Sequence, residues 1–330
     1  MKKRVLSGMR PTGPLHLGHL LGALENWRGL QESHECFFMV ADLHALMGEY
    51  ENPAEIAKNT LEMAIDWLAC GIDPKKSILF VQSQIPEHAE LGLILGMMTP
   101  LGWLERNPTY KEQLREIEGR DLTTYGFLGY PVLQAADILL YKAQAVPVGE
   151  DQLAHLELSR EIVRRFKHLY KKDLFPEPEA MLTKEARILG TDRRKMSKSY
   201  GNAINLSDPQ EAFRKKVSSM ITDPARVKLS DPGHPDVCNV YSYWKIFGAP
   251  AVAQQVYDWC TGAKKGCTDC KKELAGKMDA RLADIRKKRA ELEKDRPAVE
   301  RILREGREKA SAVAKKTMAE VKELLHLVRD

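Results

Sequence analysis

The sequence predicts an α/β domain with a parallel sheet, followed by an all-helical domain. Two observations indicate this order. Over the first 200 residues, short runs rich in aliphatic, aromatic and β-branched residues alternate with stretches of helical periodicity. Such alternation is typical of a parallel sheet with helices on its faces. From about Leu206 onward the strand pattern disappears, and Ala, Leu, Glu, Lys and Arg become frequent.

The elements of the first domain follow from these runs. We expect strands at residues 5–9, 36–41, 78–82 and 145–148, and helices at 15–30, 54–68, 88–98 and 152–170. Ligands of parallel sheets bind at the carboxyl ends of the strands, where the strand order reverses. The loops after Met9, Ala41 and Val148 are therefore expected to line a binding crevice.

The second domain is expected to contain helices at residues 209–220, 251–259, 271–294 and 297–328. The turn-rich segment 231–235 indicates an irregular joint among them. We therefore predict a Rossmann-like domain over residues 1–205 and a helical domain over residues 206–330, with the last helix free to pack back on the first domain.

Composition and charge limit the class of protein. Hydrophobic residues make up 43% and charged residues 29% of the chain, as in soluble globular proteins. We see no run of roughly 18 apolar residues and no signal-peptide core, so we expect a cytoplasmic protein without a membrane segment. Residues 1–205 carry 25 Lys/Arg against 27 Asp/Glu, whereas residues 206–330 carry 26 against 19. This basic second half suits a polyanion such as RNA, or is only a solvated helix surface.

A strand, a glycine turn and a helix follow one another around His16-Leu17-Gly18-His19. Helix N-termini present unpaired N–H groups, so a polyphosphate can bind there. His16 and His19 share one face of the first helical turn and can donate hydrogen bonds to phosphate oxygens. Gly18 has no side chain to exclude an adenine ring. Taken alone, such a histidine pair is more often structural.

A basic loop, Lys195-Met196-Ser197-Lys198-Ser199, follows about 180 residues later between Gly190 and Gly201. Two ammonium groups on such a loop can neutralise the charge that develops on a leaving pyrophosphate. The alternative is an exposed basic loop without function.

The two segments together resemble the paired signature of class I aminoacyl-tRNA synthetases. Two further blocks, GYPVLQAADIL at residues 129–139 and VPVGEDQ at residues 146–152, resemble the tryptophanyl-tRNA synthetases. Tyrosyl-tRNA synthetases are the nearest alternative, but they usually have Gly-Gly-x-Asp-Gln in the second block. The resemblance runs from residue 5 to the C-terminus and implies ligation of L-tryptophan to tRNA(Trp) with ATP and Mg²⁺, by a homodimer.

The resemblance also implies roles for individual residues. Asp137 would accept the indole N–H of tryptophan; a helix-surface Asp is the alternative. The rest of the tryptophan site would comprise Gln134, where many bacterial relatives have Met, with Ser7, His44 and Gln152. The ATP-binding residues would be Arg10, where Gln is common, with Pro11, Thr12, Gly18, His19, Lys111, Gly149, Glu150, Asp151, Ile188, Lys195, Met196, Ser197, Lys198 and Ser199. His16, His19, Lys195 and Lys198 would be catalytic.

Four of the six cysteines form a spaced group in the basic half: Cys238, Cys260, Cys267 and Cys270. In a cytosolic protein such a group indicates a metal site before a disulfide pair. Zn²⁺ and a [4Fe–4S] cluster both accept four cysteines, and spacing alone does not separate them. A subset of tryptophanyl-tRNA synthetases carries a [4Fe–4S] cluster on a similar pattern, so the resemblance favours iron–sulfur. Four free thiols are the remaining alternative.

Overall fold

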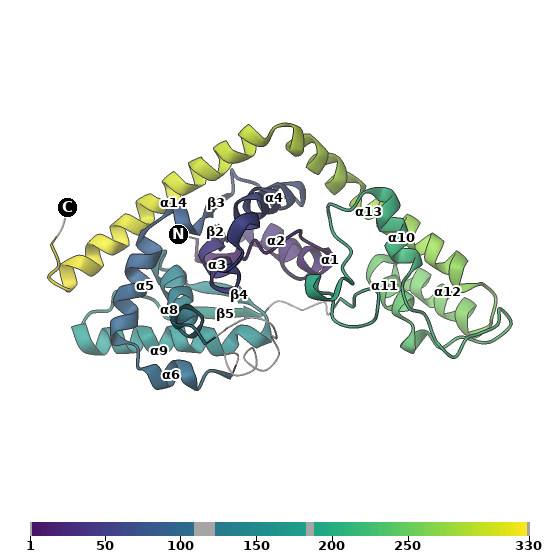
Figure 1. Ribbon diagram of the computed structural model, residues 1–330, viewed down its shortest axis with the longest axis horizontal. Coiled ribbons are helices and arrows are strands. Elements are labelled where there is room, and N and C mark those ends of the chain that lie inside the picture. The colour runs from purple at the N-terminus through teal and green to yellow at the C-terminus, as the bar shows by residue number, and fades with distance from the viewer. Residues whose placement is uncertain (1, 109–122, 183–187, 329–330) are drawn as a thin grey trace. The chain divides into compact units, whose positions relative to one another are not determined.

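Five parallel strands form one sheet in the computed structural model, which describes residues 2–108, 123–182 and 188–328 (Figure 1). The strands are β1 (Arg4–Met9), β2 (Glu35–Val40), β3 (Ser77–Val81), β4 (Ala145–Val148) and β5 (Glu179–Leu182). Their order is β3-β2-β1-β4-β5, so the winding reverses between β1 and β4. The predicted parallel-sheet class and its four predicted strands are confirmed. The short edge strand β5 was not predicted.

The α-helices of the described residues are α1 (Leu17–His19), α2 (Glu25–Ser33), α3 (Asp42–Glu49), α4 (Ile56–Ala69), α5 (Glu87–Met98), α6 (Leu101–Glu105), α8 (Tyr125–Leu140), α9 (Leu153–Tyr170), α10 (Gln210–Ser218), α11 (Asn239–Phe247), α12 (Pro250–Thr261), α13 (Cys267–Lys294) and α14 (Arg296–Leu324). The single helix expected over residues 15–30 is wrong in detail. A π-helical segment, Leu20–Leu24, separates α1 from α2. Such segments are frequent at functional sites.

Helices cover both faces of the sheet because successive side chains of a strand point to opposite faces. On β2, Phe38 stacks on Trp27 of α2 at 4.3 Å between ring centroids, while Phe37 stacks on Tyr141, at the end of α8, at 4.7 Å. All these rings are buried. The sheet therefore has an apolar layer on each side, and α8 is held directly on one of them.

Helix α14 covers the sheet edge formed by β3, as Figure 1 shows in yellow. An exposed edge strand would offer unpaired backbone groups to another chain. The approach is close at Gly306, where a Cβ would lie 1.7 Å from the carbonyl oxygen of Leu79. Only glycine fits at this position of α14.

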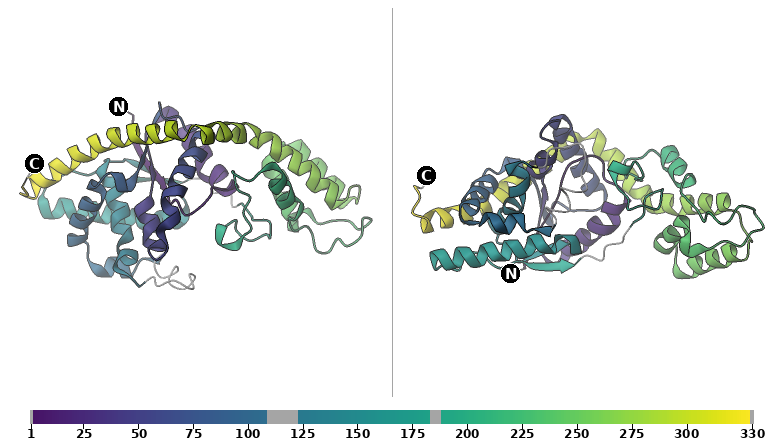
Figure 2. Two further views of the ribbon diagram at one scale, coloured as in Figure 1. Left: turned by 45° about the horizontal axis from the view of Figure 1, so that its top comes forward. Right: turned by 60° about the horizontal axis from the view of Figure 1, so that its bottom comes forward.

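Two compact units divide the chain. Unit 1 comprises Met1–Gly13, Leu24–Glu185 and Asp295–Asp330, and therefore contains the whole sheet and α14. Unit 2 comprises Pro14–Ala23 and Ala186–Lys294, and its helices α10 to α13 pack on one another (Figure 2). Among the residues that the structure describes, none of the helices is long and apolar enough to cross a membrane.

Candidate active site

One face of α8 in unit 1 carries two predicted site residues, Gln134 and Asp137, together with Tyr130, which was not predicted. Tyr130, Gln134 and Asp137 are spaced four and three residues apart, so their side chains leave the helix on the same side. Thr124 caps the helix by accepting a hydrogen bond from the backbone N–H of Phe127. Asp137 is only 2% exposed, which excludes the alternative of a helix-surface carboxylate.

Three side chains donate hydrogen bonds to the Asp137 carboxylate. His44 Nε2 lies 2.7 Å from Oδ2, His88 Nδ1 lies 2.6 Å from Oδ1, and Gln82 Nε2 lies 2.8 and 3.0 Å from the two oxygens. Burial raises the pKa of Asp137, but the hydrogen bonds from the two histidines outweigh it and hold that pKa below its usual range. The site thus contains a buried, ionised acceptor.

The predicted partners of tryptophan are placed as follows. His44, expected in the tryptophan site, lies on α3 and contacts Asp137. Gln134 is half-buried on α8, and Gln152 donates to Asp151 Oδ2 at 2.8 Å. Ser7 is half-buried in β1.

A second network surrounds the hydroxyl of Tyr130. His155 Nε2 lies 2.9 Å from Tyr130 Oη, and Asn107 Nδ2 lies 2.9 Å from His155 Nδ1. Burial raises the pKa of Tyr130 to about 12, an effect that the nearby charge of Arg10 opposes. His155 is buried, and its burial lowers its own pKa to about 4.

Two predicted ATP-binding segments follow the carboxyl ends of β1 and β4 and lie at the same end of the sheet, because these strands are parallel neighbours. Arg10 and Thr12 are exposed directly after β1, and Pro11 between them is buried. Gly149 follows β4, and Glu150 and Asp151 begin the 3₁₀ turn Glu150–Gln152. The two segments therefore meet where the strand order reverses, between β1 and β4, as predicted from the sequence. Lys111 lies outside the described residues.

In unit 2, the two predicted catalytic histidines cap the start of α1. His16 Nδ1 accepts from the N–H of Gly18 at 3.1 Å, and His19 Nδ1 accepts from the N–H of His16 at 3.1 Å. Burial, followed by the charge of Lys198, lowers the pKa of His16 to about 4. Burial, followed by His16 and then Lys198, lowers the pKa of His19 to about 2. Both rings are therefore neutral, with their proton on Nε2. Gly18 also leaves room for the ring of His16, since a Cβ there would lie 2.9 Å from Cε1.

The basic loop joins this histidine segment within the same unit. Leu17 N donates to Ile204 O at 3.0 Å, and Leu206 N donates to Leu15 O at 2.8 Å, so the segment after the loop pairs with the segment around His16. His16 and Asn205 also form an isolated antiparallel bridge. The two signature segments, far apart in sequence, are thus adjacent in space.

Asn202 fixes the conformation of the basic loop. Its Nδ2 donates to Asp192 Oδ1 at 2.7 Å and to Lys195 O at 3.2 Å, while its Oδ1 accepts from Ser197 N at 2.9 Å. A Cβ at Gly190 would lie 2.2 Å from this amide, so glycine is required there.

The loop residues themselves differ in exposure. Met196 is buried, and its N–H donates to the carbonyl of Ile188 at 3.0 Å. Lys195 is exposed and Lys198 half-buried. Ser199 lies in the 3₁₀ turn Lys198–Tyr200.

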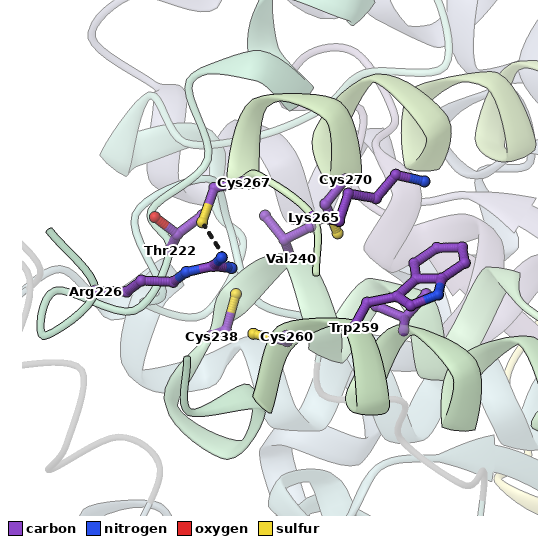
Figure 3. A pocket seen from close by; sticks show the side chains of 10 residues that line it. Thr222, Arg226, Cys238, Val240, Trp259, Cys260, Lys265, Cys267 and Cys270 are labelled. Atoms are coloured by element: carbon purple, nitrogen blue, oxygen red, sulfur yellow. Dashed lines mark hydrogen bonds between the residues drawn. The ribbon is translucent and has the colours of Figure 1, made fainter. Parts of the chain in front are cut away.

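The four spaced cysteines line one small pocket of unit 2, with a volume of about 30 Å³ (Figure 3). Cys238 precedes α11, Cys260 lies near the end of α12, and Cys267 and Cys270 lie in the first turn of α13. All four are free, half-buried thiols. The guanidinium of Arg226 enters the group, with Nη1 4.0 Å from Cys267 Sγ. Within the described residues, no three or more His, Cys, Asp or Glu side chains are placed to hold a metal ion.

The chemistry of this donor set nevertheless fits a thiolate-bound centre. Trp244 Nε1 donates to Cys270 Sγ at 3.3 Å, and N–H···S hydrogen bonds of this kind tune such centres. A Cβ at Gly233 would lie 2.4 Å from Cys260 Sγ, so the chain leaves space around that sulfur. Burial raises the pKa of Cys270 to about 11, so a cation bound at this thiol would have to displace its proton.

Comparison with known proteins decides the family. The family model described as tRNA synthetases class I (W and Y) matches residues 1–283. The chain belongs to this family. The tryptophan--tRNA ligase of Thermotoga maritima is 51% identical over 327 residues, which span 98% of this chain and 99% of the relative. That of Aquifex aeolicus is 44% identical, over 98% and 100% of the two chains.

A solved structure of the family agrees over the full length. The tryptophanyl-tRNA synthetase of Campylobacter jejuni, complexed with ADP and tryptophan, superimposes with a TM-score of 0.90 at 34% identity. It covers 98% of this chain and all of that one. The predicted resemblance to tryptophanyl-tRNA synthetases is therefore confirmed.

Several polar residues in these networks were not identified from the sequence: Gln82, His88, Asn107, Tyr130, His155 and Asn202. Gln82 directly follows β3, so the rule that ligands bind at strand ends could have found it. The others lie on helices or in a loop, and no local pattern distinguishes them from structural polar residues.

Proposed function

We propose that this chain ligates L-tryptophan to tRNA(Trp) in two steps. The carboxylate of tryptophan attacks the α-phosphorus of Mg²⁺-ATP, forming tryptophanyl-adenylate and releasing diphosphate. The 2′-hydroxyl of the terminal tRNA ribose then attacks the aminoacyl carbonyl, and AMP leaves. Neither step needs a covalent enzyme intermediate, so positioning and charge stabilisation supply the rate.

The buried carboxylate of Asp137 is the observation that carries the choice of tryptophan. The only polar group of the indole is an N–H, which can only donate, and an ionised carboxylate can only accept. A carboxylate offers about four acceptor positions, and the three present donors already make four contacts. His44 is the most accessible of the three partners, with 11% of its side chain exposed, whereas His88 and Gln82 are fully buried. We therefore assign the indole N–H to Oδ2, where it takes the place of His44.

The signature segments support the activation step. His16 and His19 are neutral and carry their proton on Nε2, so each supplies one hydrogen-bond donor to a phosphate oxygen. Lys195 and Lys198 supply the positive charge that the leaving diphosphate requires. Neutral imidazoles beside two ammonium groups avoid the repulsion that four cations would create.

The remaining assignments extend this reaction to ATP and tRNA. We assign Arg10 to the triphosphate and Gly149 to Asp151 to the ribose, because both follow adjacent strands at the reversal point. We propose that residues 1–205 form the catalytic domain and the basic, helical residues 206–330 the anticodon-binding domain, with the last helix, α14, packed back on unit 1. We propose a cytoplasmic location for this reaction.

A second copy of the chain is the proposed partner of α5. After its acidic first turn helix α5 is apolar, and Leu93 and Met97, one turn apart, are 59% and 77% exposed. Leu101 and Tyr125 are also exposed, at 58% and 82%. Exposed apolar side chains of this size mark interfaces. The proposal predicts a homodimer, which sedimentation of the purified protein would test.

For the cysteine group we propose a [4Fe–4S] cluster, with Zn²⁺ as the alternative, held by Cys238, Cys260, Cys267 and Cys270. When bound, such a centre would tie α11, α12 and α13 into a rigid surface for tRNA. Cys267→Ser is expected to lower tRNA charging and leave adenylate formation intact, whereas Cys70→Ala serves as a control outside the group. An unchanged charging rate would refute the role, and a colourless protein that contains zinc would refute the cluster.

Amino-acid-dependent exchange of diphosphate into ATP tests the activation step. Exchange that depends on tryptophan and not on tyrosine supports the proposal. Exchange with tyrosine would identify a tyrosyl-type enzyme, and no exchange with any amino acid would identify a non-catalytic RNA-binding relative.

A further inference from the structure

The Tyr130 hydroxyl is hydrogen-bonded to buried His155, which is in turn hydrogen-bonded to buried Asn107; neither of these two residues has an assigned role. His155, on the buried side of α9, is 1% exposed, and Asn107, just after α6, is 6% exposed. The ring of His155 meets that of Tyr130 edge-on, with centroids 5.2 Å apart at 68°. Buried polar groups are rarely retained without hydrogen bonds, and these three residues form a linear chain of them.

The direction of each hydrogen bond follows from the chemistry of the groups. The amide nitrogen of Asn107 only donates, so His155 Nδ1 must accept. The low pKa of His155 leaves the ring with a single proton, which must then sit on Nε2. His155 therefore donates to Tyr130 Oη, and the hydroxyl must direct its own proton elsewhere.

Tyr130 is half-buried and lies near the Asp137 carboxylate, the proposed acceptor of the indole N–H. Tyr130 shares a face of α8 with Asp137, and its ring lies edge-on to His44, 6.4 Å away, which contacts the Asp137 carboxylate. We infer that Asn107 and His155 act together as positioning residues, which set the direction of the Tyr130 hydroxyl toward bound tryptophan. The inference rests on the proposed function, because it assumes that the pocket binds this amino acid.

Steady-state diphosphate exchange with four proteins tests the inference: the natural chain, His155→Phe, Tyr130→Phe and the double variant. Loss of one hydrogen bond, about 1 kcal/mol, corresponds to about a fivefold to tenfold rise in KM for tryptophan in His155→Phe. The KM for ATP should stay within about twofold of the natural value. In the Tyr130→Phe background, His155→Phe should add no further change.

Three further variants serve as controls for rescue of the hydrogen bond and for folding. His155→Gln can still donate to Tyr130 and should restore most of the KM for tryptophan. His168→Gln, exposed on the same helix, should change neither KM. Asn107→Asp keeps the shape but replaces the donor with an acceptor. It should therefore move the His155 proton to Nδ1 and raise the KM for tryptophan as His155→Phe does.

The imidazole ¹⁵N resonances of His155 provide a readout that is independent of activity. They should report a proton on Nε2 in the natural chain and on Nδ1 in Asn107→Asp. A proton on Nδ1 in the natural chain would overturn the inference. So would a His155→Phe effect that persists in the Tyr130→Phe background or that raises both KM values equally. If the natural chain shows no tryptophan-dependent exchange, the proposed function is refuted instead.

Discussion

The contact between α14 and the edge strand β3 leads to a prediction about stability. Replacing Gly306 by alanine adds a single methyl group to the middle of a long helix. In an open helix this change is favourable by about 0.5–1 kcal/mol, since alanine has the higher helix propensity. At Gly306 the new Cβ would lie 1.7 Å from Leu79 O and 2.7 Å from Leu79 C, well inside van der Waals contact. The helix or the strand must therefore move.

The size of the effect follows from that overlap. Overpacking by one methyl group in a rigid interior costs about 1–3 kcal/mol, occasionally more. Here the obstacle is strand backbone, which cannot turn away as a side chain does, so we expect the upper part of that range. For a unit of this size, 1 kcal/mol corresponds to roughly 2–4 °C in Tm. Gly306→Ala should lower Tm by roughly 5–10 °C.

Thermal unfolding followed by circular dichroism measures this shift, and Gly29→Ala provides the matched control. Gly29 lies in α2 of the same unit, and a Cβ there would meet nothing within 4 Å. That substitution should leave Tm unchanged or raise it slightly. A Gly306→Ala protein as stable as Gly29→Ala would show that α14 does not pack against β3 as described.

Three further predictions concern the site. Asp137→Asn removes the negative charge that its hydrogen-bond donors require, a loss of about 1.5–3 kcal/mol. The KM for tryptophan in diphosphate exchange should therefore rise by about tenfold or more, while the KM for ATP changes little. Equal changes in both KM values would contradict this prediction. Lys198→Ala should lower kcat for exchange by about a hundredfold without changing the KM for tryptophan. The control, Lys215→Ala, replaces an exposed lysine of α10 and should change neither value. Equal losses in the two variants would refute a specific role of Lys198 in activation. The pKa values of His16 and His19, about 4 and 2, lie below their ordinary 6.5, so below pH 6.5 the unfolded chain binds more protons than the folded one. Stability should therefore fall as the pH falls from 6.5 to 4, and Tm of His19→Gln should fall less than that of the natural chain; identical pH profiles would contradict this.

The sheet was largely predictable because its strands are buried and rich in aliphatic and aromatic residues. The four predicted strands lie within one residue of their observed positions, since both faces of each strand demand apolar side chains. Strand β5 was missed because Glu179–Leu182 has only four residues and no β-branched one. It becomes a strand by pairing with β4, an interaction between distant segments that no local pattern records.

The site was predictable where the sequence contains contiguous motifs and less so elsewhere. The histidine segment, the basic loop and Asp137 each stand in such a motif. His88 and His155 do not, and they acquire a role only because α5 and α9 pack against α8. The contact of His44 with Asp137 was also unexpected, because it joins residues 93 positions apart.

Aminoacylation of tRNA(Trp) by the purified chain tests the central claim most directly. The assay measures the attachment of labelled tryptophan to the tRNA in the presence of Mg²⁺-ATP, with labelled tyrosine as the parallel substrate. The proposed function predicts that tryptophan is attached, that the reaction requires ATP, and that tyrosine is not attached. Attachment of tyrosine in place of tryptophan, or of neither amino acid by a folded protein, would contradict it.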